Sequence, residues 1–338
     1  MIKDALNIEG LNVQINQQHI LQDFSLKLDQ GDILCLLGPS GCGKTTALKA
    51  IAGLIPAANG HIKLFDNLIQ DANDSFNMPP EKRGMGFIFQ DYALFPHLTV
   101  FDNVAFSLKG QSKSEIAKKV SENLKLVQLS GLENRYPHQL SGGQQQRTAV
   151  ARALSSQPKL LLMDEPFSNV DNQVKQQMMA ELRGLLKANN ITCIFVTHSK
   201  QEAFSFADKT AVLNNGRIEQ VDITKNIFEH PKNEFVANFM EAGNIISGND
   251  LPQLLFNAFK PLNDACYLLK ENGFKIEADE CEGIKGLITD CLYIGYRYQL
   301  TILIIDTGIS INAESTEPFD INHEVSLKYL HNPVLISN

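Results

Sequence analysis

The sequence lacks any run of apolar residues long enough to cross a membrane. A membrane-spanning helix needs about 18 to 20 consecutive apolar residues, and no stretch of the chain approaches that length. The opening residues, MIKDALNIEG, also lack the basic and apolar blocks of a secretory signal. We therefore expect no direct insertion into lipid, so that any role at a membrane would require a partner protein.

The sequence also has no basic stripe and no metal-binding cysteine pattern. The 30 Lys and Arg residues are outnumbered by 38 Asp and Glu residues, which gives a net charge of −8. An acidic chain without clustered positive charge is not suited to nonspecific binding of nucleic acid or anionic lipid. The six cysteines are scattered, without Cys-x-x-Cys or zinc-like His spacing. We expect reduced thiols in a cytosolic chain.

What the sequence does contain is enough apolar material for about two domains. Hydrophobic residues make up 43% of the 338 positions, and a domain averages about 150 residues. Apolar and polar residues alternate from Phe24 to Leu28, the pattern of a half-buried strand. Continuous apolar runs at 32–37, 160–163 and 193–196 are typical of parallel strands buried on both faces. These runs predict an α/β layer structure in the first part of the chain.

Two segments between these runs have helical periodicity. Ser112 and Glu115 have the spacing of a capping box, and apolar residues recur at three- and four-residue intervals from Ile116 to Val127. A second apolar stripe, from Val174 to Leu185 with Met178 in it, predicts a helix whose apolar face packs in the core.

The pattern changes in the last third of the chain. Alternating apolar residues at 298–304 and 325–329, with Gly and Asn between them, predict a small all-β domain. We place the boundary near Ala242–Asn244, which gives domains of 1–240 and 241–338. Periodicity assigns no elements between residue 244 and about residue 282.

The strongest local signal is a glycine-rich loop that satisfies Gly-x4-Gly-Lys-Ser/Thr between a buried strand and a helical pattern. Glycines let backbone N–H groups approach a phosphate, and the following helix adds its dipole. Lys44 can reach the β- and γ-phosphates, and the Thr45 hydroxyl can bind Mg²⁺. The loop consists of Gly38, Pro39, Ser40, Gly41, Cys42, Gly43, Lys44, Thr45 and Thr46. It predicts a nucleotide-binding site.

Three polar residues end the other two apolar runs. Asp164 and Glu165 follow the second run, and His198 follows the third. Because the carboxyl ends of parallel strands meet at one edge of a sheet, we expect these residues beside the glycine-rich loop. Asp164 is placed to hold Mg²⁺ or its water, and Glu165 to polarise the water that attacks the γ-phosphorus. His198 is placed to bond the γ-phosphate or that water.

A second glycine-rich helix start lies at 140–147, LSGGQQQR. Such a polar N-terminus attracts anions for the same physical reason as the first loop. One nucleotide cannot readily use both loops if they sit on different subdomains, which suggests two copies of the chain facing head to tail. A capped helix without a ligand accounts for these residues equally well.

Together these residues resemble the ATP-binding cassette family. Residues 38–46 match its Walker A loop, 140–144 match its LSGGQ signature, and Asp164 and Glu165 end its Walker B run. His198 matches its switch histidine. The resemblance implies a P-loop NTPase with a RecA-like core, an antiparallel β subdomain and a helical subdomain at about 91–155.

The resemblance also implies partners and a location. It implies ATP hydrolysis by a homodimer on the cytoplasmic face of the inner membrane, bound peripherally to transmembrane permease subunits. A periplasmic or lipid-anchored solute-binding protein would deliver cargo to the permease. The β domain after residue 240 resembles the OB-like regulatory extension on ATPases of sulfate, polyamine, maltose and ferric-iron importers, with 286–295 as its strand-turn core.

The resemblance assigns roles to individual residues. It implies that Glu165, His198, Gln90 and Lys44 are catalytic. Gln90 matches the family's Q-loop, which contacts Mg²⁺ and couples to the membrane subunit. The implied ligands of Mg²⁺ are Thr45, Gln90 and Asp164.

Two further motifs of the family would contact the partner copy. The resemblance implies that ATP held by one chain meets the signature of the other, through Ser141, Gly142, Gly143 and Gln144. Ser168–Asp171 matches the D-loop, which crosses the dimer interface, although Asp171 alone fits a helix N-cap equally well.

The chain departs from the family at two places. Importer ATPases usually carry an aromatic residue that stacks on adenine, and Ile15 stands at that position here. Ile15 therefore predicts weak discrimination between ATP and GTP. In the β domain, Lys270–Asn272 replaces the usual Arg-Pro-Glu stretch.

The cargo is predicted by resemblance alone. Residues 89–100 and 164–169 look most like ferric-iron importer ATPases, and the short C-terminal domain agrees. Polyamine import is the alternative, and thiamine or sulfate import stays open. Two alternatives lie outside transport. A soluble cassette protein would usually carry two cassettes or a basic linker, whereas this acidic chain has one Walker A loop. A regulatory module with little turnover would lack the base at Glu165, which is present here.

One cysteine lies inside the glycine-rich loop. Cys42 is close to a helix N-terminus and to Lys44, two conditions that lower a thiol pKa. We hypothesise that alkylation of Cys42 blocks hydrolysis and that ATP protects it, with an inert loop thiol as the alternative.

Overall fold

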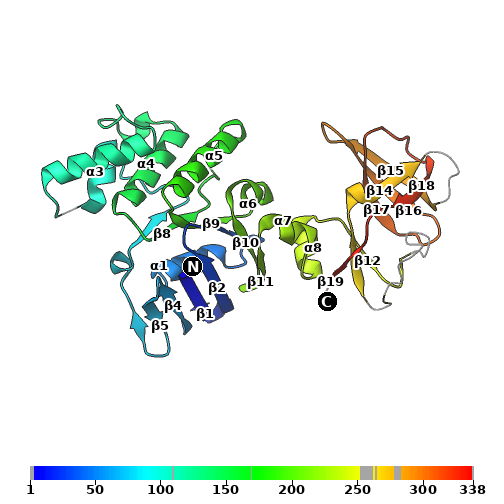
Figure 1. Ribbon diagram of the computed structural model, residues 1–338, viewed down its shortest axis with the longest axis horizontal. Coiled ribbons are helices and arrows are strands. Elements are labelled where there is room, and N and C mark those ends of the chain that lie inside the picture. Colours follow the sequence, from blue (N-terminus) through cyan, green and yellow to red (C-terminus); the bar gives the residue numbers. More distant parts are fainter. Residues whose placement is uncertain are drawn as a thin grey trace. The chain divides into compact units, whose positions relative to one another are not determined.

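The chain forms two compact units, one up to Thr224 and one from Lys225 onward (Figure 1). This computed structural model describes residues 4–108, 110–168, 170–251, 262, 265–277 and 283–336. The division between the two units lies 16 residues before the domain boundary that sequence analysis expects at 240/241. The boundary between the functional domains stays a prediction. Within the described ranges, no helix is long and apolar enough to cross a membrane.

The first unit is built on a six-stranded sheet in the order β11-β10-β3-β9-β8-β7. The strands from β10 to β7 are parallel, and β11 pairs with β10 in the antiparallel direction. Their bounds are β3 Ile33–Leu37, β7 Met85–Ile88, β8 Leu160–Asp164, β9 Thr192–Thr197, β10 Lys209–Asn214 and β11 Arg217–Asp222. Every residue of β3, β8 and β9 is buried, because helices or a second sheet cover both faces. The three apolar runs are therefore confirmed as buried parallel strands.

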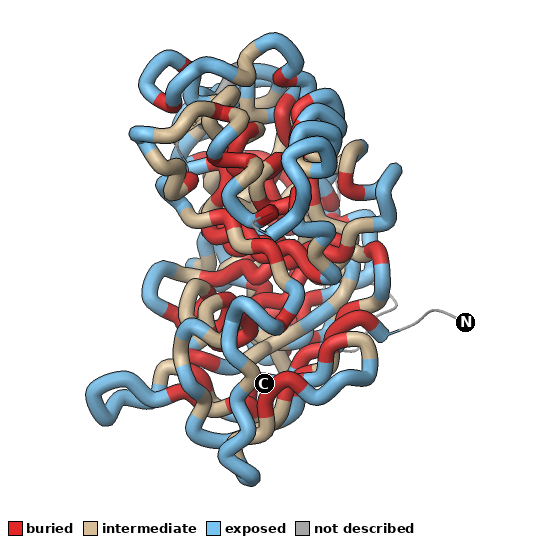
Figure 2. Tube along the Cα trace, turned by 90° about the vertical axis from the view of Figure 1, so that its left-hand side faces the viewer, coloured by how far each residue is buried: buried red, intermediate tan, exposed pale blue. Residues whose placement is uncertain are grey.

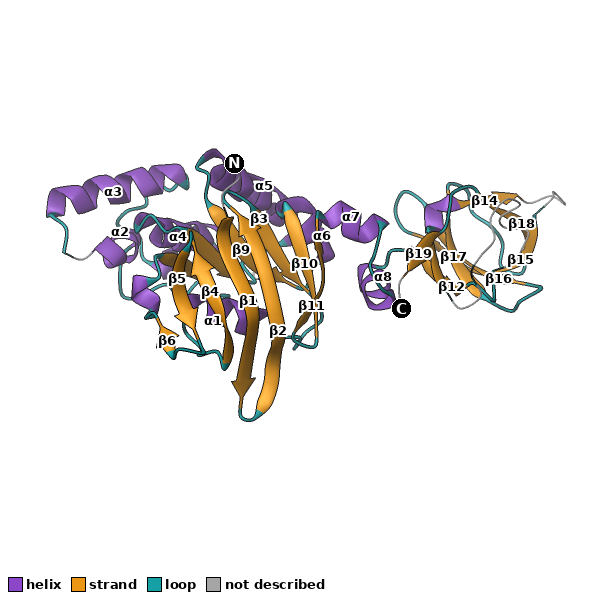
Figure 3. Ribbon diagram, turned by 60° about the horizontal axis from the view of Figure 1, so that its bottom comes forward, coloured by secondary structure: helices purple, strands orange, loops and turns teal. Residues whose placement is uncertain are grey.

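A five-stranded antiparallel sheet, β2-β1-β4-β5-β6, forms another layer (Figure 3). Its strands are β1 Asp4–Ile15, β2 Gln18–Asp29, β4 Asn59–Leu64, β5 Asn67–Asp71 and β6 Phe76–Asn77. Phe24, Leu26 and Leu28 are buried in β2 while Ser25 and Lys27 are exposed, which confirms the alternation. The helix α1 (Lys44–Ala52) shares one apolar cluster with strands of both sheets. It therefore packs between them.

A helical segment separates β7 from β8. Its helices are α2 Val100–Ala105, α3 Lys113–Leu126 and α4 Gly142–Ser155, in the region where a helical subdomain is predicted. Ser112 and Glu115 make both hydrogen bonds of the capping box at the start of α3. Val120, Leu124 and Val127 are buried, as the helical periodicity predicts. Short 3-10 turns lie within this segment at Phe106–Leu108 and Pro137–Gln139. Two others lie elsewhere in the chain, at Pro80–Lys82 and Glu271–Gly273.

Two helices connect the last parallel strands. They are α5 Asn172–Ala188 and α6 Lys200–Phe206. The helix predicted around Met178 is present, and Met178 and Leu182 are buried. The prediction that the whole stripe packs in the core is wrong, because Val174 is 52% exposed and Leu185 is only half-buried.

An arginine missed by sequence analysis anchors α1. The side chain of Arg83 is 2% exposed, and its guanidinium donates to the backbone carbonyls of Ala50, Ile51 and Met78 at 3.2, 2.7 and 2.9 Å. Burial lowers the pKa of Arg83 to about 10. Because the last carbonyls of a helix lack intrahelical partners, Arg83 satisfies the C-terminal end of α1.

The second unit begins with two helices and continues as antiparallel strands. Its helices are α7 Thr224–Glu229, which starts at the boundary, and α8 Glu234–Met240. Its sheets have the orders β12-β13-β19 and β14-β18-β15-β16-β17. The strands are β12 Asn244–Ser247, β13 Cys266–Leu269, β14 Phe274–Glu277, β15 Ile284–Tyr293, β16 Tyr298–Ile304, β17 Ser310–Ser315, β18 Glu324–Tyr329 and β19 Val334–Ile336.

The small all-β fold predicted for the C-terminal part is confirmed. Leu300, Ile302 and Ile304 of β16 are buried in one cluster with Leu327 and Tyr329 of β18. The strands β12, β13 and β14 lie in the region to which sequence analysis assigned no elements. Figure 2 shows the buried residues as red stretches along the chain, with exposed turns between them.

Candidate functional site

The glycine-rich loop joins β3 to α1, as predicted. Gly43 precedes α1 with a φ of 105°, in the left-handed region that favours glycine. A Cβ on Gly43 would lie 2.9 Å from the carbonyl oxygen of Ile20, and one on Gly38 would lie 2.4 Å from that of Leu213. These two glycines are therefore required by the close approach of the neighbouring backbone.

Lys44 is held against the loop that precedes it. Its ammonium donates to the carbonyls of Gly38 and Pro39, both at 2.8 Å. The residue is 6% exposed. A cavity of about 310 Å³ adjoins this loop and is lined by Ile20, Ser40, Gly41, Gly43, Lys44, Thr45, Thr46 and Glu165. The loop thus presents a positive charge and backbone donors to an anion.

Thr45 and Asp164 meet across the ends of two parallel strands. The Thr45 hydroxyl donates to Oδ1 of Asp164 at 2.8 Å. Burial raises the pKa of the Asp164 carboxyl, and the Thr45 hydrogen bond opposes that rise. Hydroxyl and carboxylate oxygens are the ligands that Mg²⁺ prefers, so this pair fits the metal that accompanies a nucleotide.

Glu165 lies at the centre of the site. Gln90 donates to its Oε2 at 3.2 Å, and Nδ1 of His198 lies 3.4 Å from its Oε1. The fold therefore brings together three residues that are 75 and 33 positions apart. Glu165 has a φ of 44°, a left-handed value uncommon outside glycine. Such strained positions concentrate at functional sites.

A second cavity, of about 360 Å³, also adjoins Glu165. It is lined by Glu165, Ser168, Lys175, Thr197, His198, Ser199 and Glu202. Glu165 belongs to the walls of both cavities. Glu165 is therefore the residue that the two cavities share, and its role toward an attacking water stays a prediction.

Glu202 supports the turn that carries His198, and sequence analysis missed it. The Thr197 hydroxyl donates to the Glu202 carboxylate at 2.6 Å, and Lys175 donates to it at 3.1 Å. Ser199 accepts from the backbone N–H of Glu202 and so caps α6. The Ser-x-x-Glu spacing at 199–202 was the signal for this cap.

The signature residues begin a helix but do not join the site within one chain. Ser141 is the N-cap of α4, and Ser141 and Gln144 make both hydrogen bonds of a capping box. Gly142 and Gly143 form the first turn of that helix. None of these four residues lines either cavity beside Glu165. The helix predicted at this motif is confirmed, and its contact with nucleotide stays a prediction.

The D-loop motif is described in part. Its Asn169 lies outside the described residues. The carbonyl of Asp171 accepts from the backbone N–H groups of Val174 and Lys175, which places Asp171 directly before α5. This position agrees with a helix N-cap, and a contact of Asp171 across a dimer interface stays a prediction.

The expected low pKa of Cys42 is wrong. Burial raises the pKa of this thiol, and the nearby Lys44 ammonium does not compensate. The cause is tight packing, since Cys42 is 5% exposed and a Cβ on Gly38 would lie 2.8 Å from its sulfur. Blockage of hydrolysis by alkylation, and protection by ATP, stay predictions.

We expect Cys42 to react slowly with maleimide at neutral pH. Because the thiol is buried and protonated, its labelling should be at least about tenfold slower than that of the half-buried Cys291. Peptide mass spectrometry during a labelling time course measures both rates in one sample. Equal rates for the two thiols would contradict the pKa direction.

Three comparisons with known proteins agree with this geometry, which defines a P-loop nucleotide-binding protein. The ABC transporter family model matches residues 21–168. The chain is 37% identical over 315 residues to the spermidine/putrescine import ATP-binding protein PotA of Clostridium novyi, covering 89% of each chain. It is 44% identical over 276 residues to PotA of Hahella chejuensis, covering 80% of this chain and 71% of the relative.

A solved structure is similar as well. CbiO1 from Clostridium perfringens, part of the ABC transporter complex cbiONQ, superposes with a TM-score of 0.61 and 27% identity, over 67% of this chain and 91% of that one. The chain therefore belongs to the ABC transporter family, as an ATP-binding subunit of the importer type, and it is an ATPase.

Proposed function

We propose that this chain hydrolyses ATP to drive the import of polyamines. The observation that carries the cargo is the length of the similarity, which reaches the C-terminal unit. Spermidine/putrescine import proteins match 89% and 96% of the chain in Clostridium novyi and Vibrio cholerae. Ferric iron, the cargo favoured by sequence analysis, has no support among the relatives reported above.

The residues around Glu165 support a specific hydrolytic role for each side chain. Lys44 and the loop N–H groups would bind the β- and γ-phosphates of ATP. Glu165 would accept a proton from the water that attacks the γ-phosphorus, as the bond from that phosphorus to ADP breaks. His198 and Gln90, which both contact Glu165, would orient that water and the phosphate.

Mg²⁺ would be held by Thr45, Gln90 and Asp164. The Thr45–Asp164 hydrogen bond supports this set, because it keeps two oxygen ligands adjacent. When bound, the metal would neutralise charge on the β- and γ-phosphate oxygens.

A homodimer would complete each site. The signature residues of α4 line neither cavity beside Glu165 in their own chain, so a second copy is the natural source of Ser141, Gly142 and Gly143. Gln144 and Asp171 would also face that partner. The dimer would sit on the cytoplasmic face of the cell membrane, bound to permease subunits that receive cargo from a solute-binding protein.

Reconstitution with the membrane subunits tests the cargo. We would co-purify the chain with its permease, place the complex in lipid vesicles and measure phosphate release with spermidine-loaded or ferric-loaded binding protein. Stimulation by the spermidine-loaded protein alone supports the proposal. Stimulation by the ferric-loaded protein alone overturns it, and thiamine- and sulfate-loaded proteins test the remaining cargoes.

The base selectivity of the site gives a separate prediction. Ile15 ends β1, is 38% exposed and offers only an aliphatic surface to a purine. Stacking on an aromatic ring contributes about 1–3 kcal/mol per base, so we expect ATP and GTP to compete within roughly tenfold of each other. A competition assay measures the ratio, and Ile15→Tyr should strengthen binding of both nucleotides. A preference for ATP larger than this in the unaltered chain would count against the prediction.

A further inference from the structure

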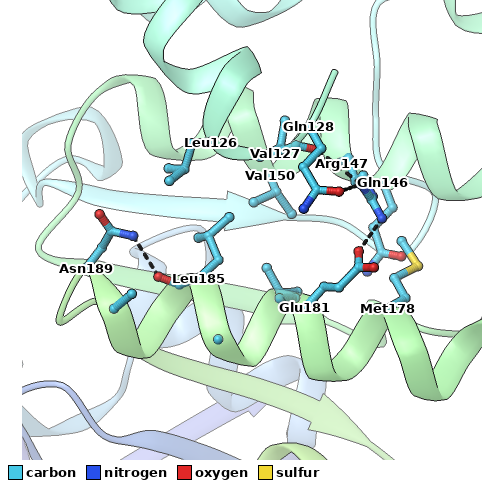
Figure 4. Close-up of a pocket in the computed structure, with 13 residues that line it drawn as sticks. Leu126, Val127, Gln128, Gln146, Arg147, Val150, Met178, Glu181, Leu185 and Asn189 are labelled. Carbon is cyan, nitrogen blue, oxygen red and sulfur yellow. Dashed lines mark hydrogen bonds and ion pairs between the residues drawn. The ribbon is translucent and has the colours of Figure 1, made fainter. Parts of the chain in front are cut away.

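A cavity of about 340 Å³ lies between α3, α4 and α5 (Figure 4). It shares no residue with the two cavities beside Glu165. Its walls are largely aliphatic, with Leu126, Val150, Leu182 and Leu185 among the lining side chains. A volume of this size suits a small molecule, because ligand pockets start at about 300 Å³, and it is too small for a helix of another protein.

The wall of the cavity holds an unpaired polar group, which is buried behind the cavity surface. Gln146 lines it and is 1% exposed, yet neither its Nε2 nor its Oε1 has a hydrogen-bond partner. Buried amides without partners are rare, because each unmade hydrogen bond destabilises the folded state. A ligand with both a donor and an acceptor would satisfy this amide.

The charged groups of the cavity are already paired. Arg147 donates to the Glu181 carboxylate from the opposite helix (Figure 4). Arg147 also donates to Oε1 of Gln128 at 3.1 Å. These two are the charged residues of the lining, so no net charge remains for an ion to neutralise. A buried charge without a partner is costly, which favours a neutral ligand.

We propose that this α4–α5 cavity binds a small, neutral, aliphatic molecule with a cis-amide edge, as in a lactam or a cyclic dipeptide. A cis amide carries its N–H and C=O side by side, so it can donate to Oε1 and accept from Nε2 of Gln146 together. The aliphatic part of such a molecule would contact Leu182 and Leu185. The unbranched side chain of Met178 beside Gln146 can adjust its rotamer to admit the ligand.

The cavity is connected to the signature motif. A Cβ on Gly143 would lie 3.8 Å from the methyl carbon of Met178, so these residues pack closely. Gln146 is on the same helix as Gly143, one turn further along. A ligand that moves Met178 therefore acts on the start of α4. This consequence rests on the proposed function, and we expect occupancy to slow ATP turnover at least about twofold.

Binding can be tested without measuring hydrolysis. The full chain has seven methionines, and ¹³C-methyl labelling would report each one, with Met178→Leu used to assign its signal. The probe is ε-caprolactam, and we expect a saturable shift of the Met178 methyl resonance. N-methylcaprolactam lacks the N–H donor and should bind roughly tenfold more weakly or worse. Absence of the Met178 shift, or equal binding of both lactams, would overturn the proposed ligand class.

A matched pair of variants tests the location. A Cβ on Gly184 meets nothing within 4 Å, so the side chain of Gly184→Leu can enter the cavity without displacing the helix. Ala180→Leu adds the same side chain at an exposed position of α5 outside the lining. We expect Gly184→Leu to abolish the response to ε-caprolactam and Ala180→Leu to retain it. A response that persists in Gly184→Leu and is lost in Ala180→Leu, with both variants melting like the parent chain, would overturn the proposed location of the site.

Phosphate release then tests the coupling. ε-Caprolactam should slow the unaltered chain and leave Gly184→Leu unaffected. Binding without any change in turnover would overturn the link to the signature motif. A chain that binds the lactam but never hydrolyses ATP would instead overturn the proposed function, because the methyl resonance reports the cavity independently.

Discussion

Replacing Glu165 with Gln is expected to lower kcat for ATP hydrolysis by about 10²- to 10⁴-fold, the usual contribution of a general base. The amide cannot accept a proton, whereas it keeps the size of the carboxylate and one of the two oxygens that Gln90 and His198 contact at 3.2 and 3.4 Å. Nucleotide binding should therefore change little, and ATP-bound dimers should accumulate. Phosphate release and size-exclusion chromatography with ATP measure the two effects.

The control for this variant is Glu229→Gln. Glu229 pairs with Lys225 at 3.5 Å on the exposed surface of α7, in the second unit, whereas the glycine-rich loop belongs to the first. Glu229→Gln changes the net charge by the same amount as Glu165→Gln. It should leave ATP turnover within about twofold of the parent chain, as surface substitutions generally do. Unchanged turnover in Glu165→Gln would remove Glu165 from its proposed role.

Replacing Arg83 with Met is expected to lower the free energy of unfolding of the first unit by about 2–6 kcal/mol, from two buried carbonyls that lose their donor. The substitution removes the donor to the buried carbonyls of Ile51 and Met78, whereas the carbonyl of Ala50 still accepts from the backbone N–H of Gly53 at 3.0 Å. Each buried acceptor that loses its partner costs about 1–3 kcal/mol. Urea unfolding followed by circular dichroism measures the loss.

Arg217→Met serves as the control for Arg83→Met. Arg217 is exposed and donates to the side chain of Gln22 at 3.1 Å. An exposed hydrogen bond of this kind contributes little, so the loss should stay below about 1 kcal/mol. If both variants lost equal stability, the buried carbonyls would not be what Arg83 stabilises.

The strands and capped helices were predictable because their signals are local. The run at 160–163 is short and apolar at every position, which is the pattern of a strand covered on both faces. Ser112 and Glu115 form the capping box that starts α3, and the two residues lie within four positions of sequence. The glycine-rich loop was predictable because its whole pattern lies within residues 38–46, although the backbone approach of Leu213 that requires glycine comes from a distant segment.

What could not be predicted depends on distant partners. Arg83 reaches carbonyls 32 and 33 positions away, and nothing near it in sequence indicates that it is buried. Glu202 receives Lys175 from another helix. Cys42 has neighbours that lower a thiol pKa, yet the packing around it has the larger and opposite effect. In each case a long-range contact outweighs the local pattern.

The helix α5 contacts two different features, one near each end. Lys175, in its first turn, pairs with Glu202 below the His198 turn, whereas Leu182 and Leu185 further along face the α4–α5 cavity. A straight helix transmits a tilt over its whole length, since its backbone hydrogen bonds resist bending. We therefore expect a contact that tilts α5 at its C-terminal end to move His198 away from Glu165. Such a contact would stop ATP hydrolysis while the nucleotide stays bound.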